Sequence, residues 1–347
     1  MSVDFQIEGI PFVNSESFWN ELSQARPGFA ISILRHTVSN FLDAKDHIVA
    51  HTSGSTGPPK EIHISKEHVI NSCNATCDFF KLEPRMTIWL CLPLDFIAGK
   101  MVVYRAMTRG LNLLIDRPEV SELAKSKRSN IDFAAMVPTQ VHELLMSNSS
   151  IFKPVSQLII GGAPVSMRIE KLLLNLSVQA YETYGMTETV SHVALRKMGQ
   201  GTFTALPNVK FVDRNGQLEI IAPHISDSPI LTNDVTELVD EYHFKWLGRL
   251  DNVLNSGGVK IHPEKIEKLI SESINREVIA FGQKNEKYGE VLCVLIESKD
   301  EVAIHLPAQL SQYERPKEIF YLSEFVRTPR GKLLRDATLK LAFANRG

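Results

Sequence analysis

Three shortages in the sequence exclude whole classes of protein. Four cysteines among 347 residues are too few for a disulfide framework. A net charge of −2 gives no basic field for nucleic acid or an anionic membrane surface, and the longest basic cluster, residues 125–128, is short. No apolar run reaches the roughly 18 residues of a membrane-spanning helix, and Asp4 stands where a signal peptide has its basic region. We therefore expect a soluble, cytoplasmic protein with neither nucleic acid nor a membrane as partner.

The composition is that of a globular protein with a sizeable core. At 347 residues and 44% hydrophobic content, the chain is long enough for two domains. Cys73 and Cys77 are four residues apart in a segment of helical pattern, without histidines or a second cysteine pair at ligand spacing. We interpret them as buried thiols rather than zinc ligands.

Short apolar runs alternate with helical patterns as far as about residue 185. The spacing of apolar residues predicts helices at 15–45, 65–81 and 98–109, and strands at 46–50, 87–92, 111–115, 133–137, 158–162 and 178–184. Such alternation is typical of a largely parallel sheet with helices on both faces, so the expected fold class is α/β.

The pattern changes toward the C-terminus. From about residue 208 it is β-rich, with a hairpin signal at 213–216, and a βαββ-like block follows from about residue 252. The glycine-rich stretch 248–258 is the candidate hinge. It would divide the chain into an N-terminal domain of residues 1–250, with a β-rich subdomain, and a small mobile α+β domain of residues 251–347.

A loop of hydroxyl, glycine and lysine residues follows the predicted strand 46–50 and suits a polyphosphate. Glycines expose backbone N–H groups to anionic oxygens, hydroxyls add donors and a lysine adds a mobile charge. The loop residues concerned are Thr52, Ser53, Gly54, Ser55, Thr56, Gly57 and Lys60. Two prolines stand between Gly57 and Lys60, so the Walker spacing is absent and a P-loop NTPase is excluded. Taken alone, such a loop is also an ordinary surface turn.

Three further segments carry side chains typical of a nucleotide site. The sequence Tyr184-Gly185-Met186-Thr187-Glu188 follows a predicted strand, and a carboxylate beside phosphate oxygens suits Mg²⁺. An acid at the start of a helix is the simpler interpretation of Glu188. Asp234 is suited to accept hydrogen bonds from ribose hydroxyls, and Arg249 offers a fork of donors for ribose or phosphate. Lys332 follows a glycine turn near the C-terminus.

In this order, the segments strongly resemble the motifs of the adenylate-forming superfamily of acyl-CoA synthetases, luciferases and peptide-synthetase adenylation domains. The resemblance covers nearly the whole chain and rests on residues 53–60, 184–188, 232–234, 248–251 with 256–258 and 261–267, and 331–332. It implies two steps: a carboxylate attacks the α-phosphate of ATP to give an acyl-adenylate, and coenzyme A then takes the acyl group. The implied ligands are ATP, Mg²⁺, coenzyme A and a small carboxylic acid, and a homodimer stays open.

The resemblance also implies roles in binding ATP. Residues 53–60 would hold the β- and γ-phosphates, and Tyr184-Gly185-Met186 would line the nucleotide site. Thr187 would touch the α-phosphate and Glu188 the Mg²⁺. Asp234 and Arg249 would hold the ribose.

Further roles implied by the resemblance concern the C-terminal region. Lys332 matches the adenylation lysine, which stabilises charge between the carboxylate and the α-phosphate. Asp251 matches the hinge residue about which the C-terminal domain rotates. After rotation, Gly257 and Gly258 would leave room for pantetheine in the thiol tunnel. Asn233 stands where the superfamily commonly has glycine, and because asparagine tolerates left-handed φ we expect the neighbouring aspartate to keep its role.

Two segments match the acid pocket of the superfamily. The residues assigned to it are Phe96, Lys100, Gly161, Gly162 and Ala163. Small residues at 161–163 would leave a flat slot for an aromatic ring, and Phe96 stands where many members have a gating histidine, with plain core packing as the alternative. Either Lys100 or Arg105 would meet a second carboxylate, unless both are solvated. These segments and the compact length most resemble the 2-succinylbenzoate:CoA ligases of bacterial menaquinone biosynthesis.

Alternatives stay open. One is another aryl or short-chain acyl-CoA ligase, or a stand-alone adenylation enzyme; another is a non-catalytic nucleotide-binding relic, which would have no chemical reason to keep both Glu188 and Lys332. The chain is shorter than the usual member before the phosphate loop, so part of the acid-pocket wall or of an oligomer surface is expected to be absent.

Overall fold

The computed structural model describes residues 4–51, 61–304, 306–328 and 333–344. The chain divides into two compact units: the first comprises residues 1–211, 220–230 and 241–243, and the second comprises residues 212–219, 231–240 and 244–347. The predicted boundary after residue 250 stays a prediction, as does the mobility of the part beyond it. Throughout the described ranges, no helix is long and apolar enough to cross a bilayer.

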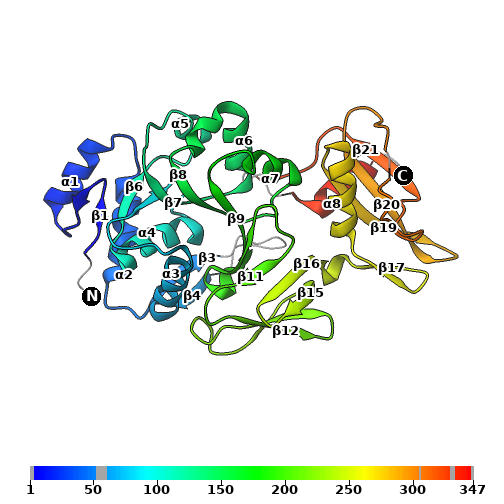
Figure 1. Ribbon diagram of the computed structural model, residues 1–347, viewed down its shortest axis with the longest axis horizontal. Coiled ribbons are helices and arrows are strands. Elements are labelled where there is room, and N and C mark those ends of the chain that lie inside the picture. The colour runs from blue at the N-terminus through cyan, green and yellow to red at the C-terminus, as the bar shows by residue number, and fades with distance from the viewer. Residues whose placement is uncertain (1–3, 52–60, 305, 329–332, 345–347) are drawn as a thin grey trace. The chain divides into compact units, whose positions relative to one another are not determined.

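The first unit is built on a sheet whose central strands are parallel (Figure 1). Its strands are β1 (Gln6–Ile7), β2 (Ile10–Pro11), β5 (Thr87–Leu90), β6 (Asn112–Ile115), β7 (Ile131–Met136), β8 (Val155–Ile160), β9 (Gln179–Gly185), β10 (His192–Lys197) and β11 (Phe203–Ala205). They lie in the order β11-β10-β9-β8-β7-β5-β6-β1-β2. Neighbours from β9 to β1 run parallel, and β10, β11 and β2 add antiparallel pairs. The central strands are buried apolar runs, as expected for a covered parallel sheet.

Helices cover both faces of this sheet. On one face, α5 (Val120–Leu123), α6 (Pro138–Asn148) and α7 (Met167–Leu173) share a core with Trp89 and Leu158 of the strands. On the other, α4 (Ile97–Arg109) contacts β5 and β6 and packs against α3 (Lys66–Phe80) and α2 (Ile31–Leu42). The α/β class predicted from the alternation is therefore confirmed.

Two elements differ from the prediction. The single helix expected at 15–45 is two helices, α1 (Glu16–Ala25) and α2, because Pro27 and Gly28, which has a φ of 81°, interrupt the helical backbone. The strand expected at 46–50 exists as β3 (His47–His51). It pairs antiparallel with β4 (Glu61–Ser65) in a separate two-stranded sheet rather than joining the parallel one.

A β-rich region follows β11 along the chain. The hairpin predicted at 213–216 joins β12 (Lys210–Arg214) to β13 (Gln217–Ile221), and β14 (Ile230–Leu231) completes this small sheet. Asn215 and Gly216 have φ values of 58° and 87°, as a type I′ turn requires. In the second unit, β15 (Asp234–Asp240) pairs with β16 (His243–Arg249), and a short 3₁₀ turn, η3 (Leu250–Asn252), follows.

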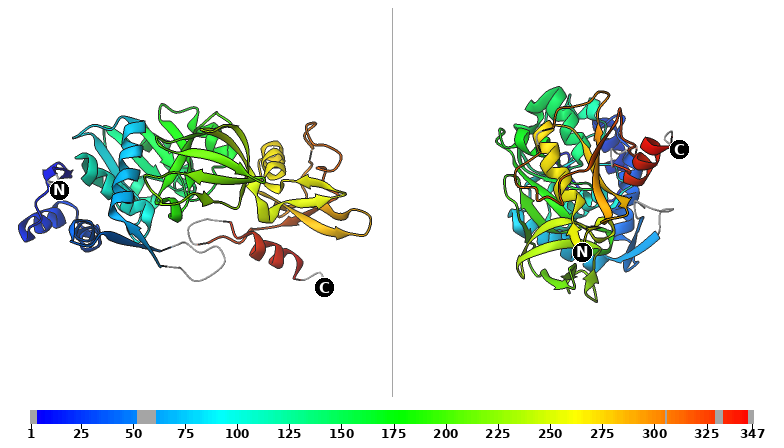
Figure 2. Two further views of the ribbon diagram at one scale, coloured as in Figure 1. Left: turned by 90° about the horizontal axis from the view of Figure 1, so that it is seen from below. Right: turned by 90° about the vertical axis from the view of Figure 1, so that its right-hand side faces the viewer.

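The C-terminal part of the second unit is a sheet between two helices. The elements are β17 (Leu254–Ser256), β18 (Val259–Ile261), α8 (Pro263–Ile274), β19 (Val278–Asn285), β20 (Gly289–Glu297), β21 (Glu318–Leu322) and α9 (Arg335–Phe343). Figure 2 shows α8 and α9 on opposite sides of β19 and β20. Alternate strand residues explain this arrangement: Ala280 and Val294 face the α8 core, whereas Ile279 and Leu295 belong to the core beside α9.

Candidate active site

Several residues predicted for the acid and phosphate sites follow the carboxyl ends of neighbouring strands. Residues 161–163 follow β8, and residues 184–188 end and follow β9. After β5, Phe96 is the N-cap of α4 and Lys100 lies near the start of that helix. β8 and β9 are adjacent parallel strands, and β7 alone separates β8 from β5. The structure thus brings these segments to one edge of the sheet, where ligands bind in open α/β folds.

The chain leaves β9 through a turn that requires glycine. A Cβ on Gly185 would lie 2.4 Å from Ser191 O and 2.6 Å from His192 Cα, because β10 returns directly beside the end of β9. Between β9 and β10, Thr187–Thr189 form the 3₁₀ turn η2. Glu188, in the middle of this turn, is exposed. The predicted metal ligand is therefore accessible at the end of β9.

Val190 closes this turn in a strained conformation. Its φ of 64° and ψ of −53° form a γ-turn, with Ser191 N donating to Thr189 O at 2.6 Å. Positive φ is unusual for a β-branched residue and costs of the order of 1–3 kcal/mol. The buried Thr189 braces the turn, since its Oγ1 accepts from Met186 N at 2.9 Å and contacts the carbonyls of Met186 and Ser191. Strain held in this way is characteristic of functional segments.

Two glycines after β8 are required for different reasons. A Cβ on Gly161 would lie 2.3 Å from Thr183 Oγ1 on β9, so any larger residue would force the Thr183 side chain to move. Gly162 has a φ of 90°, and a Cβ there would meet only Val137 Cγ1, at 3.7 Å. The flat slot for an aromatic ring beside residues 161–163 stays a prediction.

A buried ion-pair cluster supports the ends of β8 and β9. Arg196 on β10 is held by both hydrogen bonds and ion pairs. It donates to Glu170 at 3.0 and 3.0 Å, to Glu182 at 2.8 Å and to Gln200 O at 2.7 Å, and its Nη2 also forms an ion pair with Glu182 at 2.7 Å. Glu182 also accepts from Val165 N at 2.8 Å. The cluster thereby fixes the segment after residues 161–163 to β9.

Two of the cations on helix α4 lie in different surroundings. Lys100 is half-buried and donates to Val49 O at 3.3 Å; burial lowers its pKa, and nearby Asp95 opposes this. Arg105 is 1% exposed; its Nη2 donates to Ser191 Oγ at 3.1 Å, and its Nε has no hydrogen-bond partner. Burial lowers the pKa of Arg105, and no carboxylate of the described chain opposes it. Because an unpaired buried charge is costly, Arg105 is a candidate for binding an anionic group.

In the second unit, the predicted ribose residues lie at one end of the β15–β16 pair. Asp234 begins β15, Arg249 ends β16, and the N–H after Arg249 donates to the carbonyl before Asp234 at 2.9 Å. Asp234 is buried and accepts from Trp246 Nε1 at 3.1 Å. Arg249 is exposed and lies 3.3 Å from Asp251 Oδ2. Hydrogen bonds from Asn233 and Arg249 lower the pKa of Asp251. The structure brings these residues together, while their ribose and hinge roles stay predictions.

Gly257 and Gly258 form the turn between β17 and β18. Their φ values of 59° and 84° are those of a type I′ turn, which favours glycine whatever the ligand. A Cβ on Gly257 would lie 3.3 Å from Tyr288 Cδ1, whereas nothing lies within 4 Å of a Cβ on Gly258. Hairpin geometry alone explains both glycines, so the thiol tunnel stays a prediction.

Two predicted segments fall outside the described residues. They hold Thr52, Ser53, Gly54, Ser55, Thr56, Gly57 and Lys60 in one case, and Lys332 in the other. The pairing of β3 with β4 extends to His51 and Glu61, so a strand follows the first segment. A Walker loop is followed by a helix, which agrees with the exclusion of a P-loop NTPase.

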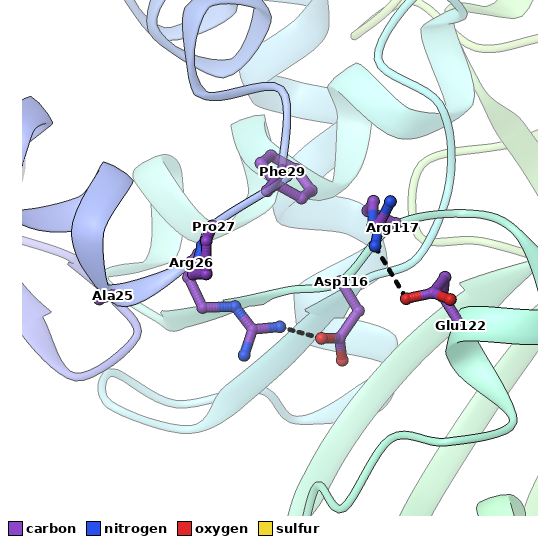
Figure 3. Close-up of a pocket in the computed structure, with 7 residues that line it drawn as sticks. All are labelled: Ala25, Arg26, Pro27, Phe29, Asp116, Arg117 and Glu122. Atoms are coloured by element: carbon purple, nitrogen blue, oxygen red, sulfur yellow. Dashed lines mark hydrogen bonds and ion pairs between the residues drawn. The ribbon is translucent and has the colours of Figure 1, made fainter.

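A cavity of about 270 Å³ lies at the carboxyl end of β6 (Figure 3) and is separate from the predicted site residues. It is lined by Ala25, Arg26, Pro27, Phe29, Asp116, Arg117 and Glu122. Its charges neutralise one another, since Arg26 pairs with Asp116 and Arg117 pairs with Glu122. Arg128, from the short basic cluster, bonds to Glu8 and Asp116, so that cluster is partly an ion-pair network.

Sequence reasoning missed the residues that support the site. These are Thr189, Ser191, His192, Arg196 and Glu182. The sequence does contain a signal for Arg196 and Glu182. Both are charged residues within strands, Arg196 in β10 and Glu182 in β9, and a charged residue that is buried in a sheet needs a partner. No comparable signal marks His192. Cys73 and Cys77 are buried free thiols, as predicted, and burial raises the pKa of Cys73 to about 12.

One family model matches more than half of the chain, that of the AMP-binding enzymes, over residues 12–224. The chain belongs to the AMP-binding enzyme family. The superfamily predicted from the motifs is therefore confirmed, and the enzyme class is that of an adenylate-forming acid–CoA ligase.

Relatives of this AMP-binding enzyme include 2-succinylbenzoate–CoA ligases. That of Listeria monocytogenes is 25% identical over 323 residues, covering 83% of this chain and 68% of the relative. The structure of an acyl-CoA synthetase (AMP-forming)/AMP-acid ligase II-like protein from Dyadobacter fermentans has a TM-score of 0.62 and 29% identity, covering 93% of this chain and 98% of that chain. The structure of O-succinylbenzoate coenzyme A synthetase from Bacillus subtilis, in complex with ATP and magnesium ion, has a TM-score of 0.72 and 20% identity. The match covers 84% of this chain and 69% of that chain. At that identity the last likeness shows the fold alone.

Proposed function

We propose that this AMP-binding enzyme joins 2-succinylbenzoate to coenzyme A, converting ATP to AMP and pyrophosphate. In the first step a carboxylate oxygen of the acid attacks the α-phosphorus, and pyrophosphate leaves. In the second step the sulfur of coenzyme A attacks the acyl carbon, and AMP leaves. The names of several relatives support this substrate, and one observation within the chain carries the proposal.

That observation is the surroundings of Arg105. 2-Succinylbenzoate is an aromatic dicarboxylate, so one carboxylate reacts and the other keeps its charge. A pocket for it therefore needs a cation that is not already neutralised. Arg105 is buried and has an unpaired Nε, and it lies on the same helix as Lys100 of the predicted pocket, a helix that Phe96 precedes as the N-cap residue. Its planar fork matches a carboxylate better than the ammonium group of Lys100 does.

The residues of η2 fit a metal-assisted nucleotide site. Mg²⁺ takes one or two protein carboxylates and completes its shell with phosphate oxygens and waters. Glu188 supplies one exposed carboxylate, and no group of three or more acidic, histidine or cysteine ligands occurs among the described residues, so the nucleotide would provide most ligands. The ion would neutralise charge on the phosphate oxygens. Thr187 is proposed to contact the α-phosphate, Asp234 and Arg249 the ribose, and Lys332 the reacting carboxylate.

The proposal is tested by pyrophosphate release. The purified protein is incubated with ATP, Mg²⁺ and one acid from a panel of 2-succinylbenzoate, benzoate, a short fatty acid and a long fatty acid, with and without coenzyme A. Turnover restricted to 2-succinylbenzoate, with 2-succinylbenzoyl-CoA as product, is the expected result. Preference for another acid would refute the substrate while keeping the reaction, and lack of thioester product would indicate a stand-alone adenylation enzyme.

A further inference from the structure

A series of buried hydrogen bonds connects Arg105 with helix α3. Arg105 Nη2 lies 3.1 Å from Ser191 Oγ, which lies 3.2 Å from His192 Nδ1. His192 Nε2 lies 3.2 Å from Thr76 Oγ1. Thr76 Oγ1 donates to Ser72 O, one turn earlier in α3, at 3.1 Å. Arg105, His192 and Thr76 are buried and Ser191 is partly buried, so water has limited access to these bonds.

The chemistry of the groups defines where the protons lie. An arginine N–H can only donate, so Ser191 Oγ accepts from Arg105 and its own proton is left for His192 Nδ1. At the other end, the hydroxyl proton of Thr76 is used by the carbonyl of Ser72, so Thr76 Oγ1 accepts from Nε2 of His192. A neutral His192 with its proton on Nε2 satisfies every bond. Burial, with the positive charge of Arg105, lowers the pKa of His192 well below its ordinary value and favours this neutral form.

The backbone also restrains the imidazole. His192 is the first residue of β10 and pairs with Gly185 at the end of β9. The strained γ-turn at Val190 stands two residues before it. His192 therefore lies between a fixed hydroxyl on α3 and the hydroxyl that contacts the guanidinium, directly after the turn that carries Glu188.

We infer that His192 is a positioning residue for the acid substrate, an inference that rests on the proposed function. By accepting the proton of Ser191, it presents the Ser191 oxygen to Arg105 as an acceptor. That bond fixes one Nη group and leaves the unpaired Nε for the second carboxylate of the acid. Because a carboxylate takes two parallel bonds from a guanidinium fork, rotation of the fork weakens binding of the acid but not of ATP.

The test is a double-mutant cycle in the full-length protein. The variants are H192L, R105M and the combination, with KM and kcat measured for 2-succinylbenzoate and KM for ATP. Loss of one oriented hydrogen bond predicts about a tenfold rise in the acid KM for H192L, with the ATP KM and kcat changed less than twofold. In the R105M background, H192L should add nothing, because its effect passes through the guanidinium.

Two variants keep the test decisive if leucine prevents folding. Asparagine can place Oδ1 where Nδ1 accepts from Ser191, so H192N should restore the acid KM to within about threefold of the wild type. S191A removes the oxygen between the two residues and should raise the acid KM as H192L does. Thermal melts report folding independently, and 2-succinylbenzoate alone should raise the Tm of the wild type more than that of S191A.

Two outcomes would overturn the inference. One is an equal effect of H192L with and without R105M; the other is a fall in kcat with no change in the acid KM, which is the sign of a general structural role. If the wild type does not use 2-succinylbenzoate, the proposed function fails separately. The same cycle is then measured with the acid that the panel identifies, and an unchanged KM in both H192L and S191A overturns the inference by itself.

Discussion

Replacing Arg196 by methionine would leave two buried carboxylates without their cation. Glu170 and Glu182 are 5% and 9% exposed, and their bonds to Arg196 measure 2.7 to 3.0 Å. Breaking a buried ion pair by removing one partner costs about 3–5 kcal/mol. Backbone donors remain, among them Gly199 N to Glu170 at 2.6 Å and Val165 N to Glu182 at 2.8 Å. Because these backbone donors still bind the carboxylates, we expect R196M to lower the free energy of unfolding by no more than about 3–5 kcal/mol near neutral pH.

Urea denaturation followed by circular dichroism measures this loss of stability, as the difference in the free energy of unfolding between the wild type and R196M.

A matched control separates charge from hydrogen bonding. R196K keeps the positive charge but offers three donors in place of five, so its loss of stability should lie between the wild type and R196M. A loss below about 1 kcal/mol in R196M would refute the reasoning, because that is the range of exposed ion pairs.

Other variants address the site, the second unit and the two half-reactions. G161A places a Cβ 2.3 Å from Thr183 Oγ1 and should lower kcat/KM for the acid at least about tenfold. The double variant G161A/T183A should recover activity, whereas full activity in G161A alone would contradict the close approach. Burial raises the pKa of Glu267 to about 7, so the wild type should lose stability as pH rises from about 4.5 to about 7, and E267Q should flatten that slope in urea titrations. K332A should abolish adenylate formation but spare thioester formation from supplied acyl-adenylate, and loss of both half-reactions in this variant would argue against domain rotation. G258F should spare adenylate formation but abolish thioester formation, with G258N as the control for backbone strain.

Local patterns explain which parts of the fold were predictable. The runs that form β7 and β8 are apolar over nearly their whole length, and Asn215-Gly216 specifies a two-residue hairpin by its positive φ values. Each of these signals is contained within a few consecutive residues. The break at Pro27 is also a local signal, but the prediction of a helix at 15–45 rested on apolar spacing alone.

The supporting contacts of the site could not be predicted in this way. Arg105 and Ser191 are 86 positions apart, and Thr76 and His192 are 116 apart. Their meeting depends on how α3 and α4 cover the sheet, which the pattern of one chain does not specify. The antiparallel pairing of β3 with β4 was missed for a related reason, because a buried strand shows its burial in the sequence but not its partner.

The small hairpin β1–β2 determines how far the large sheet can grow. Its strands are two residues long, and the outer one ends in Pro11, which has no N–H to offer another strand. The strand that it covers, β6, contains the buried residues Leu113, Leu114 and Ile115. Were the hairpin to detach, this apolar strand would offer an open hydrogen-bonding edge to a second molecule. Covering an apolar edge strand in this way is one means by which proteins limit edge-to-edge aggregation.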